Sequence, residues 1–277
     1  TYRGYDIISM PPPSSGGVHL IEMLNILEGY DLAKLNREES LHIIAEAMKR
    51  AYADRATFMG DPDAVKMPVA GLISKKYAAA LRAQIGQRAT PSSEIRSGNP
   101  ADFEGQNTTH FSVIDRDGNA VSNTYTLNFS YGLGLVAEGT GVLLNNELDD
   151  FTSKPGTANA YGLVGYNANL PGPNRRPLSS MTPTIFLKDG KPFLITGSPG
   201  GSRIISTVLQ IIVNVIDFNL AVDQAVSAPR IHHQWIPDVL EVELHNREWE
   251  NAPRPVISNL EADRQREAQG DLLRTLI

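Results

Sequence analysis

The chain has 277 residues, 41% hydrophobic and 20% charged, which is ordinary for a soluble globular protein with one large or two small domains. Its formal net charge of −6 argues against nucleic-acid binding, because surfaces that follow phosphates gather lysine and arginine. It contains no cysteine, which excludes disulfides and thiolate zinc sites, and no apolar stretch reaches the roughly 18 residues of a membrane span.

The first third of the chain has a helical pattern. It opens at Thr1 without a methionine, and residues 5–10 already resemble a strand, so we expect the chain to begin inside a domain, with any targeting segment upstream. Apolar residues at helical spacing predict helices at about residues 19–28, 39–59 and 74–85. Residues 87–107 are polar and irregular, as in an exposed linker.

The pattern changes to strands at Thr108. Residues 110–127 and 184–196 each read as two strands joined by a turn that contains Asp-Gly. The second hairpin runs into the small residues 197–202, which open an apolar helix at about 203–217, and a further helix is predicted at 221–227. Paired strands with helices segregated around them predict a layered α+β fold.

Five short clusters of polar and small residues stand out. Taken singly, each has an ordinary structural explanation: a Thr-Thr pair suits a strand, an Asp-Asp pair suits a solvated turn, and a Gly-Gly pair suits a tight connection. The clusters are Asn107-Thr108-Thr109-His110, Thr124-Tyr125-Thr126-Leu127-Asn128, Asn145-Asn146-Glu147-Leu148-Asp149-Asp150-Phe151, Arg176-Pro177-Leu178-Ser179-Ser180-Met181 and Gly197-Ser198-Pro199-Gly200-Gly201-Ser202-Arg203.

Together and in this order the clusters closely resemble the γ-glutamyltransferase (γ-glutamyltranspeptidase) family of N-terminal-nucleophile hydrolases. The resemblance covers roughly residues 4–243, with further matching stretches at 9–17, 52–55 and 228–235. It implies a layered αββα fold, incomplete at the N-terminal end. By the same resemblance, residues 1–107 are the mainly helical C-terminal part of the large-subunit region, 108–243 are the small-subunit region with the nucleophile, and 244–277 are an atypical polar tail.

The resemblance gives Thr108 the role of nucleophile after an autocatalytic cut between Asn107 and Thr108. An internal threonine hydroxyl is a weak nucleophile, and no strong base is adjacent to it in the sequence. Cleavage would free the Thr108 α-amine, whose ordinary pKa of about 7.7–8.0 lets it accept the hydroxyl proton at neutral pH. One residue would then supply both nucleophile and base.

Recognition of the donor is implied in the same way. Asn128, Glu147 and Asp150 resemble the groups that hold the donor's α-amino group, with Asp150 as the charged partner of the ammonium. Glu147 stands where many relatives have glutamine. Ser179 and Ser180 resemble the donors to the α-carboxylate. The family's large subunit also supplies an arginine to this carboxylate, and the resemblance places it upstream of this chain.

Thr126, Gly200 and Gly201 complete the implied catalytic set. Thr126 resembles a second threonine that orients the nucleophile, and the Gly200 and Gly201 N–H groups resemble an oxyanion hole. We expect no metal or cofactor. His232 and His233 are neighbours on a strand and point to opposite faces, so structural hydrogen bonding is expected for them, and packing for His110.

The resemblance implies γ-glutamyl transfer from glutathione or other γ-glutamyl amides to water or to an amino-acid or peptide acceptor. It also implies two subunits from one precursor, a site completed by an upstream segment, and a periplasmic or secreted location. Two alternatives stay open. One is a β-lactam acylase of the same superfamily that handles a glutaryl group, and the other is a fragment that binds a partner and never matures.

Overall fold

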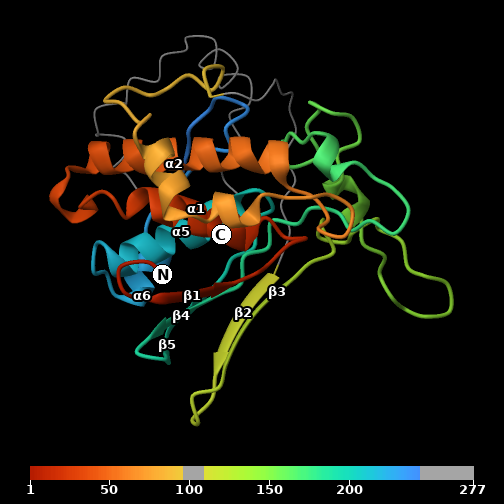
Figure 1. The fold of residues 1–277 in the computed structure, drawn as a ribbon. Helices are drawn as coiled ribbons and strands as arrows, with labels where there is room; N and C mark the ends of the chain where they lie inside the picture. The colour runs from red at the N-terminus through yellow and green to blue at the C-terminus, as the bar shows by residue number, and fades with distance from the viewer. Residues whose placement is uncertain (96–108, 244–277) are drawn as a thin grey trace. The chain divides into compact units, whose positions relative to one another are not determined.

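A computed structural model describes residues 1–95 and 109–243, and its first part is helical (Figure 1). Strand β1 opens this part, and α1 and α2 lie side by side in it. The elements are β1 (Asp6–Ser9), α1 (Gly16–Leu27), the 3₁₀ turn η1 (Leu32–Lys34), α2 (Arg37–Phe58), α3 (Val69–Leu72) and α4 (Lys75–Arg82).

Helix α2 begins at a reciprocal cap. The Asn36 side chain accepts from the Glu39 N–H at 2.9 Å, while the Glu39 carboxylate accepts from the Asn36 N–H at 3.2 Å. These two bonds satisfy donors that a helix start leaves without partners. The helix then runs 22 residues, which carries Arg55 in its last turn to the loop before β4.

The second part alternates strands with helices and irregular segments. Its elements are β2 (Thr109–Ile114), β3 (Ala120–Tyr125), η2 (Glu147–Asp150), η3 (Asn167–Asn169), β4 (Thr184–Lys188), β5 (Lys191–Thr196), α5 (Arg203–Ile216), α6 (Val222–Ser227), β6 (Ile231–His232) and β7 (Glu241–Val242). Both predicted hairpins are present, and the mixture of elements confirms the α+β class.

The central sheet joins the two parts of the chain. Strand β1 pairs antiparallel with β4, which pairs with β5, giving the order β1-β4-β5. Hairpin β2–β3 forms its own ladder, and Ser122 on β3 links it to the sheet: its hydroxyl donates to the Thr196 carbonyl at 2.9 Å and accepts from the Thr184 N–H at 3.1 Å.

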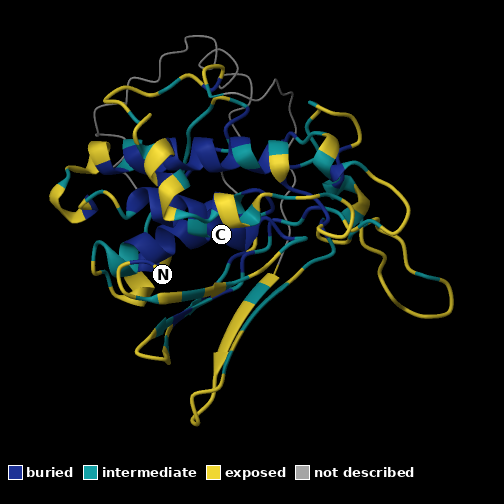
Figure 2. Cartoon of the chain, in the orientation of Figure 1, coloured by how far each residue is buried: buried dark blue, intermediate teal, exposed yellow. Residues whose placement is uncertain are grey.

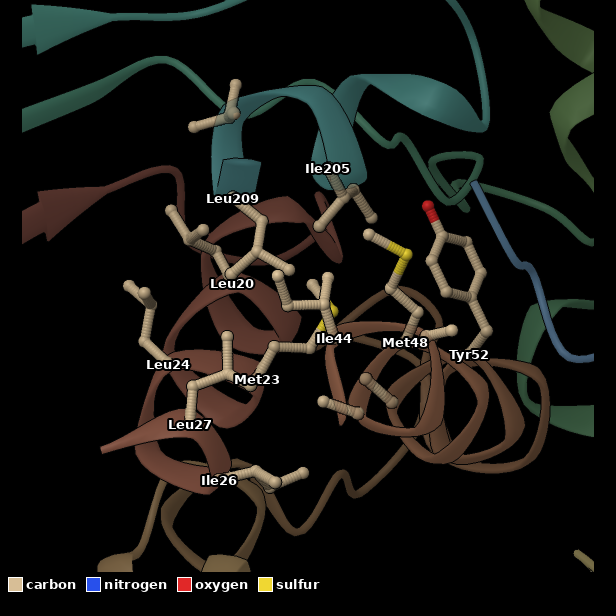
Figure 3. Close-up of a cluster of buried hydrophobic side chains, with 14 of the residues drawn as sticks. Leu20, Met23, Leu24, Ile26, Leu27, Ile44, Met48, Tyr52, Ile205 and Leu209 are labelled. Atoms are coloured by element: carbon tan, nitrogen blue, oxygen red, sulfur yellow. The ribbon is translucent and has the colours of Figure 1, made fainter. Parts of the chain in front are cut away.

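Helices α1, α2 and α5 enclose the apolar core (Figure 3). Leu20 and Met23 of α1, Met48 of α2, and Ile205 and Leu209 of α5 are fully buried in it. Phe186 of β4 and Leu194 of β5 belong to the same cluster, so one face of the sheet is covered by the helices. The core therefore uses residues from both sides of position 108.

The outer face of hairpin β2–β3 is apolar and exposed (Figure 2). Phe111, Val113, Val121 and Tyr125 share this face by register, and each is more than half exposed. Exposed apolar faces of this kind usually mark a contact surface. Among residues 1–95 and 109–243, nothing covers these four side chains.

Candidate active site

One cavity brings together six of the residues that the sequence singles out. They come from four segments far apart in the chain: the end of hairpin β2–β3, the 3₁₀ turn η2, the loop before β4 and the start of α5. The cavity is lined by Thr126, Asn128, Asp150, Ser179, Ser180 and Gly201, together with Tyr161, Leu163, Met181 and Ile204. Two of the predicted residues, Glu147 and Gly200, flank this lining without belonging to it.

A tight turn after β3 presents Thr126 and Asn128. Asn128 adopts a positive φ of 74°, which asparagine tolerates better than most residues, and it is buried. Its N–H donates to Thr126 Oγ1 at 2.8 Å, and its side-chain amide donates to the Asn146 carbonyl at 3.1 Å. The Tyr161 hydroxyl donates to the Asn128 carbonyl at 2.6 Å, which fixes the turn against the cavity wall.

Two interacting carboxyl groups stand on η2. Burial, together with the negative charge of Glu147, raises the pKa of Asp150, and the positive charge of Arg55 opposes the rise. Burial also raises the pKa of Glu147. Glu147 Oε1 is buried and has no hydrogen-bond partner among the described residues. This corner of the cavity therefore offers acceptors that a cationic group would satisfy.

Ser179 and Ser180 lie in a loop that the start of α1 holds in place. The Ser179 carbonyl accepts from the Ser15 N–H and from the Ser15 hydroxyl, each at 2.9 Å. The Ser180 hydroxyl accepts from Arg55 Nη2 at 3.0 Å. The loop is thus tied to α1 and α2 in addition to its internal bonds, in which the Met181 N–H donates to Ser179 Oγ and the Thr182 hydroxyl to the Ser180 carbonyl.

Gly200 and Gly201 form the turn into α5, with φ of 127° and 50°. A Cβ on Gly201 would come within 2.3 Å of the Tyr161 ring, so no larger residue fits there without a shift. Within the described residues neither glycine N–H donates a hydrogen bond. Free N–H groups at a helix start attract negative charge.

Asn107 and Thr108 lie outside the described residues. The first described residue after them, Thr109, pairs with Tyr125, directly before Thr126. His110 follows, and its ring packs so closely on Gly197 that a Cβ there would lie 2.2 Å from it. Its ring nitrogens contact the hydroxyls of Thr124 and Ser112, each at 3.0 Å.

His232 and His233 are buried and hydrogen-bonded to different partners. His232 Nδ1 contacts Ser206 Oγ at 2.7 Å, while His233 Nε2 lies 3.2 Å from an Asp238 carboxylate oxygen. Across residues 1–95 and 109–243, no three His, Cys, Asp or Glu side chains come together as metal ligands would. The described helices include none long and apolar enough to span a bilayer.

Sequence reasoning missed part of the cavity wall. Tyr161 and Leu163 stand in an irregular segment, and Ile204 in the first turn of α5, where no pattern distinguishes a cavity residue from a core residue. Arg55 lies in one of the stretches that carry the family resemblance, but its contact with Ser180 depends on how α2 packs on the loop before β4.

Comparison with known proteins places this α+β fold in the N-terminal-nucleophile hydrolase superfamily. Cephalosporin acylase from Bacillus halodurans superposes with a TM-score of 0.68 at 27% identity, over 84% of this chain and 40% of that one. The family model of gamma-glutamyltranspeptidase matches residues 1–271, so the chain belongs to the gamma-glutamyltranspeptidase family.

Curated relatives give the same family and show how much of it is present. The glutathione hydrolase proenzyme of Escherichia coli is 58% identical over 245 residues, which cover 87% of this chain and 42% of that protein. The Acylase ACY 1 proenzyme of Pseudomonas sp. (strain SE83) is 43% identical, over 83% of this chain and 39% of that protein. The chain thus spans about two fifths of the length of these relatives.

Proposed function

We propose that this protein takes the γ-glutamyl group from glutathione or another γ-glutamyl amide and passes it to water or to an amino-acid or peptide acceptor. The observation that carries the proposal is the cavity: four distant segments converge on it with a threonine, a carboxyl group, two serines and a glycine at a helix start. The relatives named glutathione hydrolase proenzyme support the same activity.

The nucleophile in this proposal is Thr108, exposed by a cut after Asn107. Side chains alternate along a strand, so Thr109 lies on the exposed face of hairpin β2–β3 with Phe111, opposite to the face of His110. That face packs on Gly197, at the beginning of the segment that leads to Gly200. The alternation supports Thr108 rather than Thr109 as the residue directed at the cavity.

The reaction then runs in two balanced steps. The free α-amine of Thr108 takes the hydroxyl proton as the oxygen attacks the γ-carbonyl carbon, and the proton passes to the departing amine, leaving a γ-glutamyl-threonine ester. Water or an acceptor amine attacks the ester and returns the hydroxyl. Thr126 orients the nucleophile, and the free N–H groups of Gly200 and Gly201 stabilise the oxyanion in both steps.

The donor's amino-acid end is held by residues of η2, the turn after β3 and the loop before β4. Asp150, with Asn128 and Glu147 beside it, receives the α-ammonium, whose charge offsets the repulsion between the two carboxyls. Ser179 and Ser180 donate to the α-carboxylate. The resemblance adds an upstream arginine to this carboxylate.

A second candidate is a glutaryl-handling acylase of the same superfamily, favoured by the similarity to the two acylases. The half-buried Asp150–Glu147 pair favours the γ-glutamyl donor, since a glutaryl group has no ammonium to offset these charges. A third is a fragment that binds a partner and does not mature, for which the exposed face of hairpin β2–β3 is the supporting observation.

We further propose that the apolar face of hairpin β2–β3 is covered by another part of the same precursor, and that the mature enzyme has a large and a small subunit. The name proenzyme, shared by several relatives, supports maturation from one precursor. A periplasmic or secreted location follows from the family resemblance alone.

Maturation tests the proposal directly. On a denaturing gel after incubation, this chain is expected to give pieces of 107 and 170 residues (277 − 107 = 170), and sequencing of the larger should begin Thr-Thr-His-Phe. Thr108→Ala should abolish both the cut and γ-glutamyl turnover, while Thr109→Ala should keep both. Persistence of only the uncut chain in a folded sample would contradict the proposal, and a dead Thr109→Ala beside a processed Thr108→Ala would move the nucleophile by one residue.

A further inference from the structure

Arg55 is a buried cation that the proposed mechanism leaves without a role. It stands in the last turn of α2 with 5% of its surface exposed. Among the described residues its hydrogen bonds end on uncharged oxygens: Ser15 Oγ at 2.9 Å, Ser180 Oγ at 3.0 Å and the Leu178 carbonyl at 3.5 Å. Burying a charge without a paired carboxylate is costly, so the position calls for an explanation.

The hydrogen bond to Ser180 fixes the direction of a hydroxyl in the cavity. A guanidinium can only donate, so Ser180 Oγ acts as the acceptor in this bond. The single hydroxyl proton must then point away from Arg55. Since Ser180 lines the cavity, an anionic oxygen placed there would receive it.

The hydrogen bond to Ser15 fixes the backbone beside that hydroxyl. Ser15 Oγ accepts a hydrogen bond from Arg55 Nε, and the Ser15 hydroxyl donates one to the Ser179 carbonyl at 2.9 Å. Arg55 therefore determines the polarity of two hydroxyls at once, one directed to the loop and one to the cavity.

Arg55 also acts on the carboxyl end of the site through its charge. It lines a second cavity together with Asp150, which borders both cavities. Its positive charge favours the ionised form of Asp150, whereas Glu147 and Asp149 disfavour it. Arg55 thus supports two groups of the cavity: the Ser180 hydroxyl, which can donate to an anion, and the Asp150 carboxylate, which can accept from a cation.

We propose that Arg55 is a positioning residue for the amino-acid end of the donor: it turns the Ser180 hydroxyl toward the α-carboxylate and supplies the positive charge that faces Asp150. This rests on the proposed function, in which Ser180 recognises the carboxylate. Arg55 is distinct from the upstream arginine that the resemblance implies, because it reaches the donor only through other residues of this chain.

Three p-nitroanilide donors separate the two effects in the mature protein. The γ-glutamyl donor carries both groups, the glutaryl donor only the carboxylate, and the 4-aminobutyryl donor only the amine. Arg55→Lys keeps the charge but cannot donate to Ser15 and Ser180 with the same planar fork. We expect it to raise KM on the order of tenfold for the two carboxylate donors and to leave the 4-aminobutyryl donor within about twofold.

The combination with Ser180→Ala tests whether Arg55 acts through this serine. Contacting residues couple, so Arg55→Lys should add less than about twofold in KM to Ser180→Ala.

Arg55→Met, which also removes the charge, should in addition move the acid limb of kcat/KM for the 4-aminobutyryl donor to higher pH. Arg50→Met is the matched control, since Arg50 is equally buried on α2 but bonds to Glu46; it should leave the KM ratios among the three donors unchanged.

Equal KM increases for all three donors, or fully multiplicative effects in the double variant, would overturn the positioning role. A wild-type protein that matures but does not cleave the γ-glutamyl donor would overturn the proposed function and this inference with it. Normal wild-type cleavage with an unchanged Arg55→Lys variant would overturn the inference alone.

Discussion

At the scale of single residues, we expect the pair of carboxyls on η2 to set how the site responds to pH. Glu147 and Asp150 lie three positions apart, and the charge of Glu147 contributes to the raised pKa of Asp150. An ammonium binds the ionised form of Asp150, so donor binding should strengthen as pH rises through that pKa. We therefore expect the residue at position 147 to tune the pH range of donor binding through the pKa of Asp150.

Glu147→Gln is expected to move the acid limb of kcat/KM for a γ-glutamyl donor to lower pH. The amide removes the negative charge that disfavours ionisation of Asp150, so the pKa of Asp150 falls. The pH profile of initial rates measures this. Glu138→Gln, a change at an exposed position, should leave the limb in place. A limb that moves to higher pH in Glu147→Gln would show that Glu147 supports the carboxylate by hydrogen bonding.

Gly201→Ala is expected to lower kcat by on the order of 10²–10³ in any fraction that matures, the usual cost of losing an oxyanion donor. Its Cβ would collide with the Tyr161 ring and displace the N–H groups at the start of α5. Gly190→Ala is the control, because φ there is also positive, at 74°, but the space around it is open. The control should cost about 1 kcal/mol of stability and leave kcat unchanged. Equal loss of kcat in both variants would argue against a local role.

The predicted site residues share one property: each belongs to a short sequence motif, and in some of these motifs local bonds define the shape. The turn at Thr126–Asn128 is one example, since it is built from bonds between neighbours in the chain. Arg55 and Tyr161 could not be found this way, because they reach the cavity through packing of α2 and of residues 159–163 against distant segments. Position 108 itself stays a prediction.

At the scale of elements, both hairpins and the longer helices follow from periodicity, and the differences lie at their ends. Helix α2 begins at Arg37 rather than residue 39, because the cap formed by Asn36 and Glu39 precedes the first apolar residue. Strand β3 ends at Tyr125 rather than residue 127, because Asn128 turns back onto Thr126. Helix α3 and strands β6 and β7 have four residues or fewer, too short for a periodic pattern.

One contact between elements ties residues on the two sides of position 108. Ser92 donates through its N–H and its hydroxyl to the two Asp238 carboxylate oxygens, at 2.8 and 2.7 Å. The Trp235 indole donates to the Ile95 carbonyl at 2.8 Å. The segment that leads into the linker is therefore held by residues of the last described loop.

Asp238→Ala is expected to destabilise the protein by about 1–3 kcal/mol, because Ser92 is buried and would lose the acceptor of two hydrogen bonds. His233 would lose its carboxylate partner as well. Thermal unfolding measures the change. Glu138→Ala, at an exposed position without such contacts among the described residues, should shift Tm by less than the error. An unchanged Tm in Asp238→Ala would mean that the Trp235 contact alone holds the segment.

At the scale of the whole molecule, a cluster of buried ionisable groups lies in the helical part. Burial raises the pKa of Glu22 to about 8 and that of Asp54 to about 7, and lowers the pKa of His19 to about 3. His19 Nδ1 contacts Glu22 at 2.7 Å, and the Tyr77 hydroxyl donates to Asp54 at 2.6 Å. The negative charge of Glu22 adds to the raised pKa of Asp54, and the positive charge of Arg55, on the same helix as Asp54, adds to the lowered pKa of His19.

This cluster predicts that stability falls as pH rises from about 6.5 to 8. In the unfolded chain these carboxyls are already ionised in this range, whereas in the folded state Glu22 and Asp54 still hold protons. The folded state therefore binds more protons than the unfolded state. Its free energy of unfolding falls by up to about 1.4 kcal/mol per pH unit for each such proton. Below about pH 6.5 the slope is shallower, because unfolded His19 takes up a proton that folded His19 does not, which offsets one of the two protons held by Glu22 and Asp54. Denaturant unfolding at several pH values measures the slope, and Glu22→Gln should flatten it. Stability that rises over this range in the wild type, or a slope that Glu22→Gln leaves unchanged, would mean that the cluster is ionised in the folded protein.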